Sequence, residues 1–167
     1  EGMASLRDMH VGRAPAVTDA SLRFLRGTGL HTLNLSQTSV TDDGMTFLRS
    51  LQSLRRLEIA GTRLTDDGLR HLQGLTALNL TDTRLTDAGL EHLAKMTDLQ
   101  HLKLERTPIQ GHGLRHLGGL TSLRELNLSG TKVTGQGFEH LRQLTQLEGL
   151  ACRGAPVTDQ APEMLRG

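Results

Sequence analysis

The sequence repeats itself about every 24 residues, and this repetition limits the possible folds more than any other feature. The shared pattern is LxxLxLxxTxVTDxGLxxLxxLxx, with 33 leucines in the 167-residue chain. Clear copies occupy residues 30–53, 54–74, 75–98, 99–122 and 123–146. Degenerate copies, which match the pattern less well, occupy 6–29 and 147–167. The copy at 54–74 lacks three residues after its GL-x-H-L segment. Such a chain folds as a stack of units, each contacting its neighbours.

Each half of the repeat has its own periodicity. The LxxLxL half ends in a two-residue alternation, which predicts a short strand. The GLxxLxxL half places leucine on one face of a short helix. The Thr-Asp pair before it offers an N-cap oxygen and a favourable charge at the helix start. One strand and one helix cannot bury their own apolar faces, so we expect copies to stack with parallel strands about 4.8 Å apart.

This pattern resembles the leucine-rich repeat family over residues 6–167. The TDxGL form is similar to repeats of many bacterial proteins and to the cysteine-containing repeats beside F-box domains. The resemblance implies an α/β fold: a curved, right-handed solenoid of about seven turns. Its parallel sheet would line the concave face and its short helices the convex face. We expect one domain over residues 1–167, as part of a larger protein.

One position departs from the common family pattern. Where the family usually has Asn after the strand, this chain has Thr38, Thr62, Thr83, Thr107 and Thr131, followed by Ala155. A threonine hydroxyl offers fewer donors than an asparagine amide. We therefore expect a thinner ladder of hydrogen bonds along this turn, within the same fold.

Composition and charge exclude several function classes. The net charge of +1, from 19 basic and 18 acidic residues, argues against nucleic acid and anionic membranes as partners. No stretch of 18 consecutive apolar residues occurs, so we expect no segment that spans a membrane. Cys152 is the only cysteine, which excludes an internal disulfide, and its place in the repeat predicts a buried, inert thiol. We expect a cytoplasmic protein.

Motifs of catalysis are also missing from these residues. The sequence has no Gly-rich phosphate loop, HExxH or GxSxG, so we expect neither an enzyme nor a bound cofactor. The three N-x-S/T sequons at Asn34, Asn79 and Asn127 follow from the repeat itself, and glycans there would stand in the middle of the sheet.

The candidate site is the concave sheet face. Its side chains come from the third, fifth and seventh positions of each copy, which vary while the leucines do not. Charge concentrates in the middle, and the predicted partner-binding residues are Arg56, Glu58, Asn79, His101, Lys103, Glu105, Glu125 and Asn127. The alternative interpretation of this face is a solvated polar sheet surface. Because the face has no aromatic residue, a protein or peptide would be held by hydrogen bonds and charge pairs.

A column of histidines suggests metal binding but is better explained by packing. His71, His92, His116 and His140 share one position, which Phe24 and Phe47 occupy in earlier copies. Alternation of Phe and His indicates a half-buried slot between helices, and no Cys or carboxylate recurs beside it. We expect no metal site here.

A column of aspartates is best explained by helix capping. It contains Asp19, Asp42, Asp66, Asp87 and Asp159, and Gly111 and Gly135 interrupt it. Calcium-binding repeats use denser Asp and Gly patterns, so capping is the simpler reading. We expect the helices of the copies at 99 and 123 to start less firmly and their amides to exchange faster than those around Asp66 and Asp87.

Three functions are compatible with these patterns. The first is non-catalytic protein recognition on the concave face. The second is a targeting arm of a larger enzyme, such as a ubiquitin-ligase receptor or a bacterial effector, which the family resemblance implies. The third is a structural scaffold that self-associates through uncapped ends.

Overall fold

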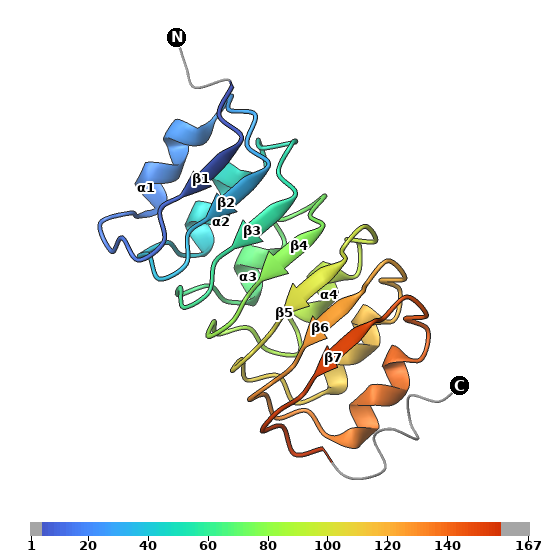
Figure 1. Cartoon of the computed structure of the whole chain (residues 1–167). Coiled ribbons are helices and arrows are strands. Elements are labelled where there is room, and N and C mark those ends of the chain that lie inside the picture. Colours follow the sequence, from blue (N-terminus) through green and yellow to red (C-terminus); the bar gives the residue numbers. More distant parts are fainter. Residues whose placement is uncertain (1–4, 158–167) are drawn as a thin grey trace.

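The structure, a computed structural model describing residues 5–157, is a stack of strand–helix units (Figure 1). Seven parallel strands form one open sheet in which each strand lies beside its neighbours in the sequence. The strands are β1 (Asp8–His10), β2 (Thr32–Asn34), β3 (Arg56–Glu58), β4 (Ala77–Asn79), β5 (His101–Lys103), β6 (Glu125–Asn127) and β7 (Gly149–Ala151). The predicted α/β solenoid is confirmed, with one strand in each of the seven copies.

Short helices lie behind the sheet in Figure 1. They are α1 (Asp19–Leu22), η1 (Arg23–Leu25), α2 (Asp42–Leu48), α3 (Asp66–Leu69), α4 (Leu90–Leu93), η2 (His112–Leu117) and η3 (Gly135–Leu141), where η marks a 3₁₀-helix. The longest of them within residues 5–157 have seven residues, and none of these helices could cross a membrane.

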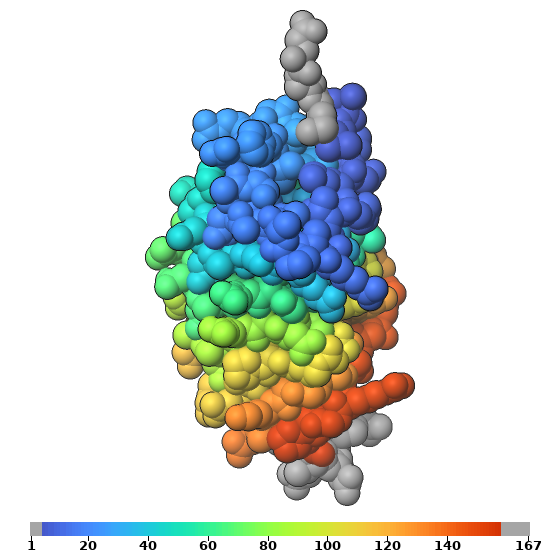
Figure 2. All heavy atoms as spheres, turned by 90° about the vertical axis from the view of Figure 1, so that its left-hand side faces the viewer, coloured from blue at the N-terminus to red at the C-terminus, as the bar shows by residue number. Residues whose placement is uncertain are grey.

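The strand register brings equivalent positions of every copy into line. Thr32 pairs with Arg56, Arg56 with Ala77, and so on along the sheet. The leucine in the middle of each of β2 to β6 points into the core and is at most 2% exposed. Figure 2 shows the copies as successive bands along the molecule, so each copy is covered mainly by its two neighbours.

The threonine column forms a local ladder. Thr38, Thr62, Thr83, Thr107 and Thr131 are buried, and each hydroxyl donates to the carbonyl three residues earlier, at 2.6–2.8 Å. The bond stays within one copy and satisfies a buried polar group. This agrees with the expected thinner ladder, since the threonine hydroxyls donate to no neighbouring copy.

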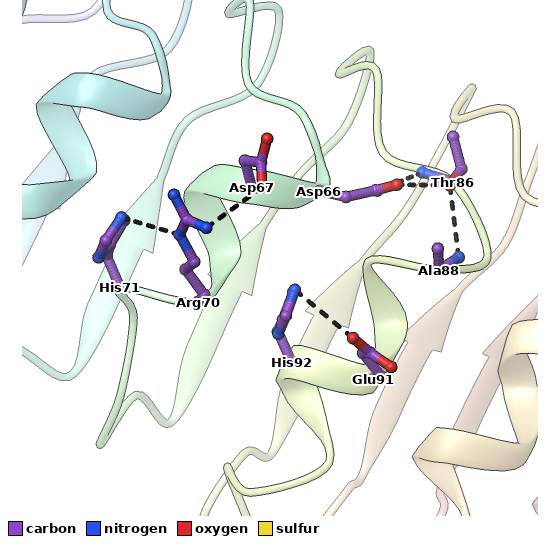
Figure 3. A network of polar contacts seen from close by, with 8 residues as sticks. All are labelled: Asp66, Asp67, Arg70, His71, Thr86, Ala88, Glu91 and His92. Atoms are coloured by element: carbon purple, nitrogen blue, oxygen red, sulfur yellow. Dashed lines mark hydrogen bonds and ion pairs between the residues drawn. The ribbon is translucent and has the colours of Figure 1, made fainter.

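The aspartates were predicted to cap the helices of their own copies, and this assignment was wrong. Thr41 and Thr65 occupy the N-cap position but make no side-chain capping bond. Instead, each aspartate accepts bonds from the next copy: Asp42 accepts from the backbone N–H of Thr65 at 2.8 Å and from its hydroxyl at 2.6 Å. Figure 3 shows the same pair of bonds between Asp66 and Thr86. The carboxylate therefore joins two copies.

The glycine of the TDxG motif lies directly against this carboxylate. A Cβ atom at Gly68 would lie 2.5 Å from Oδ1 of Asp42, and one at Gly44 or Gly89 would overlap the aspartate of the copy before it. A side chain at this position would push the aspartate out of hydrogen-bonding reach. The Thr, Asp and Gly of the motif therefore form one contact between adjacent copies, which we call the Asp–Thr–Gly bridge.

Where a glycine replaces the aspartate, the helix that loses its acceptor is the one in the next copy, not the one in the same copy as the sequence suggested. In the copy at 99, Asp87 accepts from the N–H groups of Gly111 and Gly113 at 3.1 and 3.0 Å, so the start of η2 is held. In the copy at 123, Gly111 stands where the preceding aspartate would be. The N–H of Thr134 then has no hydrogen-bond acceptor within residues 5–157.

The predicted burial of Cys152 was wrong, because its side chain is half-buried. Cys152 follows β7, the last strand of the described sheet, and no further strand within residues 5–157 covers its outer side. Asp159, the last member of the predicted aspartate column, lies outside the described residues.

We expect Asp66→Ala to lower the free energy of unfolding by about 1–2 kcal/mol, because it removes two charge-assisted bonds to Thr86. Urea denaturation measures this. Asp67→Ala is the matched control, since Asp67 only pairs with Arg70 at 3.5 Å on an exposed surface, and it should cost under about 0.5 kcal/mol. Equal losses in the two variants would contradict the bridge.

Hydrogen exchange tests whether the less protected helix start lies in the copy at 123, one copy after the missing aspartate. The amide of Thr134 should exchange faster than those of Thr41, Thr65 and Thr86, each of which donates to an aspartate. Amide exchange followed by NMR gives the rates. A Thr134 amide as protected as the other three would contradict this assignment.

Candidate functional site

The sheet face is the surface formed by the third-, fifth- and seventh-position side chains of the seven copies. Because successive side chains of a strand point to opposite sides, the third and fifth positions face away from the core when the fourth faces into it. The strand register aligns these positions into columns that run along the whole sheet. The short strands thus hold the third- and fifth-position residues of the seven copies in one layer.

A depression of about 260 Å³ lies in the middle of this face. Ala77 forms its floor, because its small side chain stands between the larger Arg56 and His101 of the neighbouring strands. Six of the eight predicted site residues line it: Arg56, Glu58, Asn79, His101, Lys103 and Glu125. We call this feature the central depression.

The other two predicted residues do not line it and have structural contacts. Glu105 accepts a bond from the hydroxyl of Thr81 at 3.3 Å. The side-chain oxygen of Asn127 accepts from the backbone N–H of Ser129 at 3.0 Å. The contact of Glu105 joins two adjacent copies, while that of Asn127 stabilises the turn after its own strand.

The asparagines of the fifth column share this turn contact. The side-chain oxygens of Asn34 and Asn79 also accept the N–H two residues later, at 2.9 and 3.1 Å. The Asn-Leu-Ser/Thr triplets are therefore explained by a local turn. Asn79 has both roles, since it also lines the depression.

The charged groups of the depression differ in how they are paired. Glu58 accepts from the Nδ2 amide of Asn34 at 3.2 Å, and Glu125 lies 3.2 Å from Nδ1 of His101. Arg56 and Lys103 make no side-chain hydrogen bond or ion pair within the described part of the chain. The depression therefore presents two unpaired cations beside two carboxylates that are already engaged.

A column at the eighth position of each copy was missed in the sequence. Its residues take left-handed backbone angles: Gln37, Asp82 and Arg106 have φ of 57°, 55° and 52°. Gly61 and Gly130 take the same conformation in this column, which glycine adopts without strain. The recurring glycines at this position are the signal that could have revealed it.

Two members of this column form a bidentate ion pair at the border of the sheet face. Arg106 donates from Nε and Nη2 to the two carboxylate oxygens of Asp82, at 2.7 and 2.6 Å. This bond to Arg106 lowers the pKa of the Asp82 carboxyl below its usual 3.8. The pair contributes to stability above that pH and loses its contribution as the pH falls through the lowered pKa.

The histidine column lies on the helix side, away from the depression. His71, His92, His116 and His140 are half-buried, as is Phe47, which agrees with the predicted packing slot; Phe24 is an exception at 66% exposure. Each histidine contacts the residue before it, as Figure 3 shows for His71 with Arg70 and His92 with Glu91. Partial burial lowers the pKa of His71, and the charges of Arg70 and Arg49 lower it further.

Within residues 5–157, no group of three or more His, Cys, Asp or Glu side chains is placed to hold an ion.

Comparisons with known proteins identify the repeat. Two family models, both described as leucine rich repeat, match residues 73–133 and 50–72, which together span half of the chain. The structure of internalin C2 from Listeria monocytogenes str. 4b F2365 is similar, with 25% identity, 98% of this chain and 69% of that chain covered, and a TM-score of 0.80.

A second internalin, inlF of the same strain, shares the fold. It has 20% identity, 98% of this chain covered and a TM-score of 0.74, and this chain spans 46% of its length. No curated protein matches the chain.

The ion pair at the border of the sheet face yields a prediction about pH. In Arg106→Gln, the pKa of Asp82 should rise toward 3.8, because the bond that favours its ionised form is lost. An NMR titration of the carboxyl carbon measures it. Arg84→Gln is the control, because Arg84 is exposed, lies two residues from Asp82 and makes no bond to it, so the pKa of Asp82 should not change. An unaltered Asp82 pKa in Arg106→Gln would show that the pair is absent in solution.

Proposed function

We propose that this chain, which belongs to the leucine-rich repeat proteins, binds a partner protein through its sheet face. The family supports a protein–protein interaction module as the function class, and its domains are typically non-catalytic. The similarity to Listeria internalins suggests a bacterial origin. The central depression is the observation that carries the choice of face.

The depression suits recognition because its polar groups are positioned before a partner arrives. Arg56, Ala77 and His101 stand on three adjacent strands, and the pairing of these strands fixes their backbone positions. A preorganised surface loses less conformational entropy on binding than a mobile loop does. The unpaired cations Arg56 and Lys103 would attract an acidic group of the partner.

The affinity of such a contact should be moderate. The described sheet face contains no Trp, Tyr or Phe, the residues that often anchor tight interfaces. Charge pairs at an exposed surface contribute little each, and salt weakens them. We therefore expect binding in the micromolar range, about −8 kcal/mol, that weakens as salt is added.

A charge-reversal variant of the central depression tests the proposal. Lys103→Glu/Glu125→Lys keeps the net charge and reverses two side chains that line the depression. Lys132→Glu/Glu139→Lys makes the same exchange at exposed positions near η3, on the helix side. Circular dichroism should show both variants folded.

The expected result concerns one partner captured from a lysate of the source organism and then purified. Wild type and the helix-side variant should bind it equally, while the sheet-face variant should bind at least about tenfold more weakly, a loss of about 1.4 kcal/mol. A partner retained by the sheet-face variant and lost by the helix-side variant would refute the proposed face.

A further inference from the structure

The three residues missing from the copy at 54–74 change the structure at one place. In the other clear copies, a buried apolar residue stands midway between the helix and the next strand: Leu51, Met96, Leu120 and Leu144. In the short copy, Leu72 is followed by Gln73, Gly74 and then Leu75, the first residue of the next copy. Gly74 makes the short connection possible with a left-handed φ of 66°.

An opening remains where the missing residue would lie. It has a volume of about 360 Å³, at the small end of the range of ligand pockets. Its walls come from the end of the copy at 30–53 (Leu48, Arg49, Leu51 and Gln52), from both ends of the short copy (Leu54, Arg55 and 72–74) and from Leu75, and we call it the notch. Leu51 and Leu72 at its floor are buried, but at 5% and 7% they have the highest exposed fractions of the buried leucines.

The rim of the notch is positively charged. Arg49 and Arg55 line it, and no acidic residue does, although acidic and basic residues nearly balance in the whole chain. The side chain of Arg49 has no hydrogen-bond or ion-pair partner among the described residues. An exposed excess of positive charge next to apolar side chains favours a ligand that carries both an anion and an apolar group.

Arg55 is held in position to receive such an anion. Its Nη1 donates to the carbonyls of Gln52 and Leu54, both at 2.9 Å. These bonds fix the guanidinium, while its Nε and Nη2 have no partner within residues 5–157. Nε and Nη2 lie on one edge of the planar group, and two parallel donors on one edge match the two oxygens of a carboxylate.

We propose that the notch is a second binding site, which takes an acidic segment of a partner protein. A carboxylate of that segment pairs with Arg55 and Arg49, and an adjacent leucine-like side chain fills the opening above the buried leucines of the floor. The site lies at the connections that lead into β3 and β4 and shares no lining side chain with the polar wall of the central depression. It is therefore independent of the proposed sheet-face function.

A short peptide probes the site directly. The ¹⁵N-labelled protein is titrated with acetyl-Gly-Glu-Leu-Glu-Gly-amide, and with the same peptide carrying Gln in place of both Glu. The acidic peptide should shift the amide signals of Gln73 and Gly74 and saturate with a dissociation constant of about 1 mM, as expected for one small contact. The glutamine peptide should give no saturating shift.

Three variants separate the notch from general surface charge. Arg55→Gln should weaken binding by at least about fivefold, because one bidentate pair is lost. Arg84→Gln, the same change elsewhere, should alter it by less than about twofold. Insertion of Leu-Thr-Ser after Gly74, as at residues 120–122, restores the 24-residue period, keeps both arginines and should abolish binding.

Several results would overturn the proposal. Persistent binding by a folded insertion variant would assign the effect to surface charge. Equal binding of the glutamine peptide would remove the carboxylate from the account. Inorganic phosphate that saturates the same amides as tightly as the peptide would make the notch a general anion site. If the insertion variant does not fold, the comparison of the Arg55→Gln variant with the Arg84→Gln variant still decides between the notch and general surface charge.

Discussion

The Asp–Thr–Gly bridge is the contact on which the rest of the structure depends. One carboxylate accepts two bonds from the threonine of the next copy, and the glycine of that copy leaves room for it. Leucine burial drives the copies together, but burial has no direction. The bridge does have direction, so at the three junctions where it forms, Asp19–Thr41, Asp42–Thr65 and Asp66–Thr86, it fixes how a copy is set against the one before it.

The proposed functions follow from this regularity and from one break in it. Where the copies are regular, the third and fifth positions form straight columns, and the small side chain of Ala77 opens a depression between its larger neighbours. Where three residues are missing, the same regular stacking leaves a notch with an arginine-lined rim. Stable scaffolding and variable surface are therefore separated within each copy, which is how repeat proteins acquire different partners without changing fold.

The sequence predicted the features that depend on the period, and it failed where partners lie far apart along the chain. Buried leucines and strand columns follow from the repeat itself. The bond that Asp42 accepts from Thr65 spans 23 residues, so local rules of helix capping assigned the aspartate to its own helix. The central depression depends on the relative sizes of Arg56, Ala77 and His101 on adjacent strands, which no single copy reveals.

A double-mutant cycle on Asp19 and Gly44 tests the bridge most directly. The free energy of unfolding is measured by urea denaturation for wild type, Asp19→Ala, Gly44→Ala and the double variant. Because a Cβ at Gly44 would overlap Asp19, Gly44→Ala should cost at least about 1 kcal/mol less once the carboxylate is absent. Losses that add to within about 0.5 kcal/mol would show that the two residues act independently and would contradict the account.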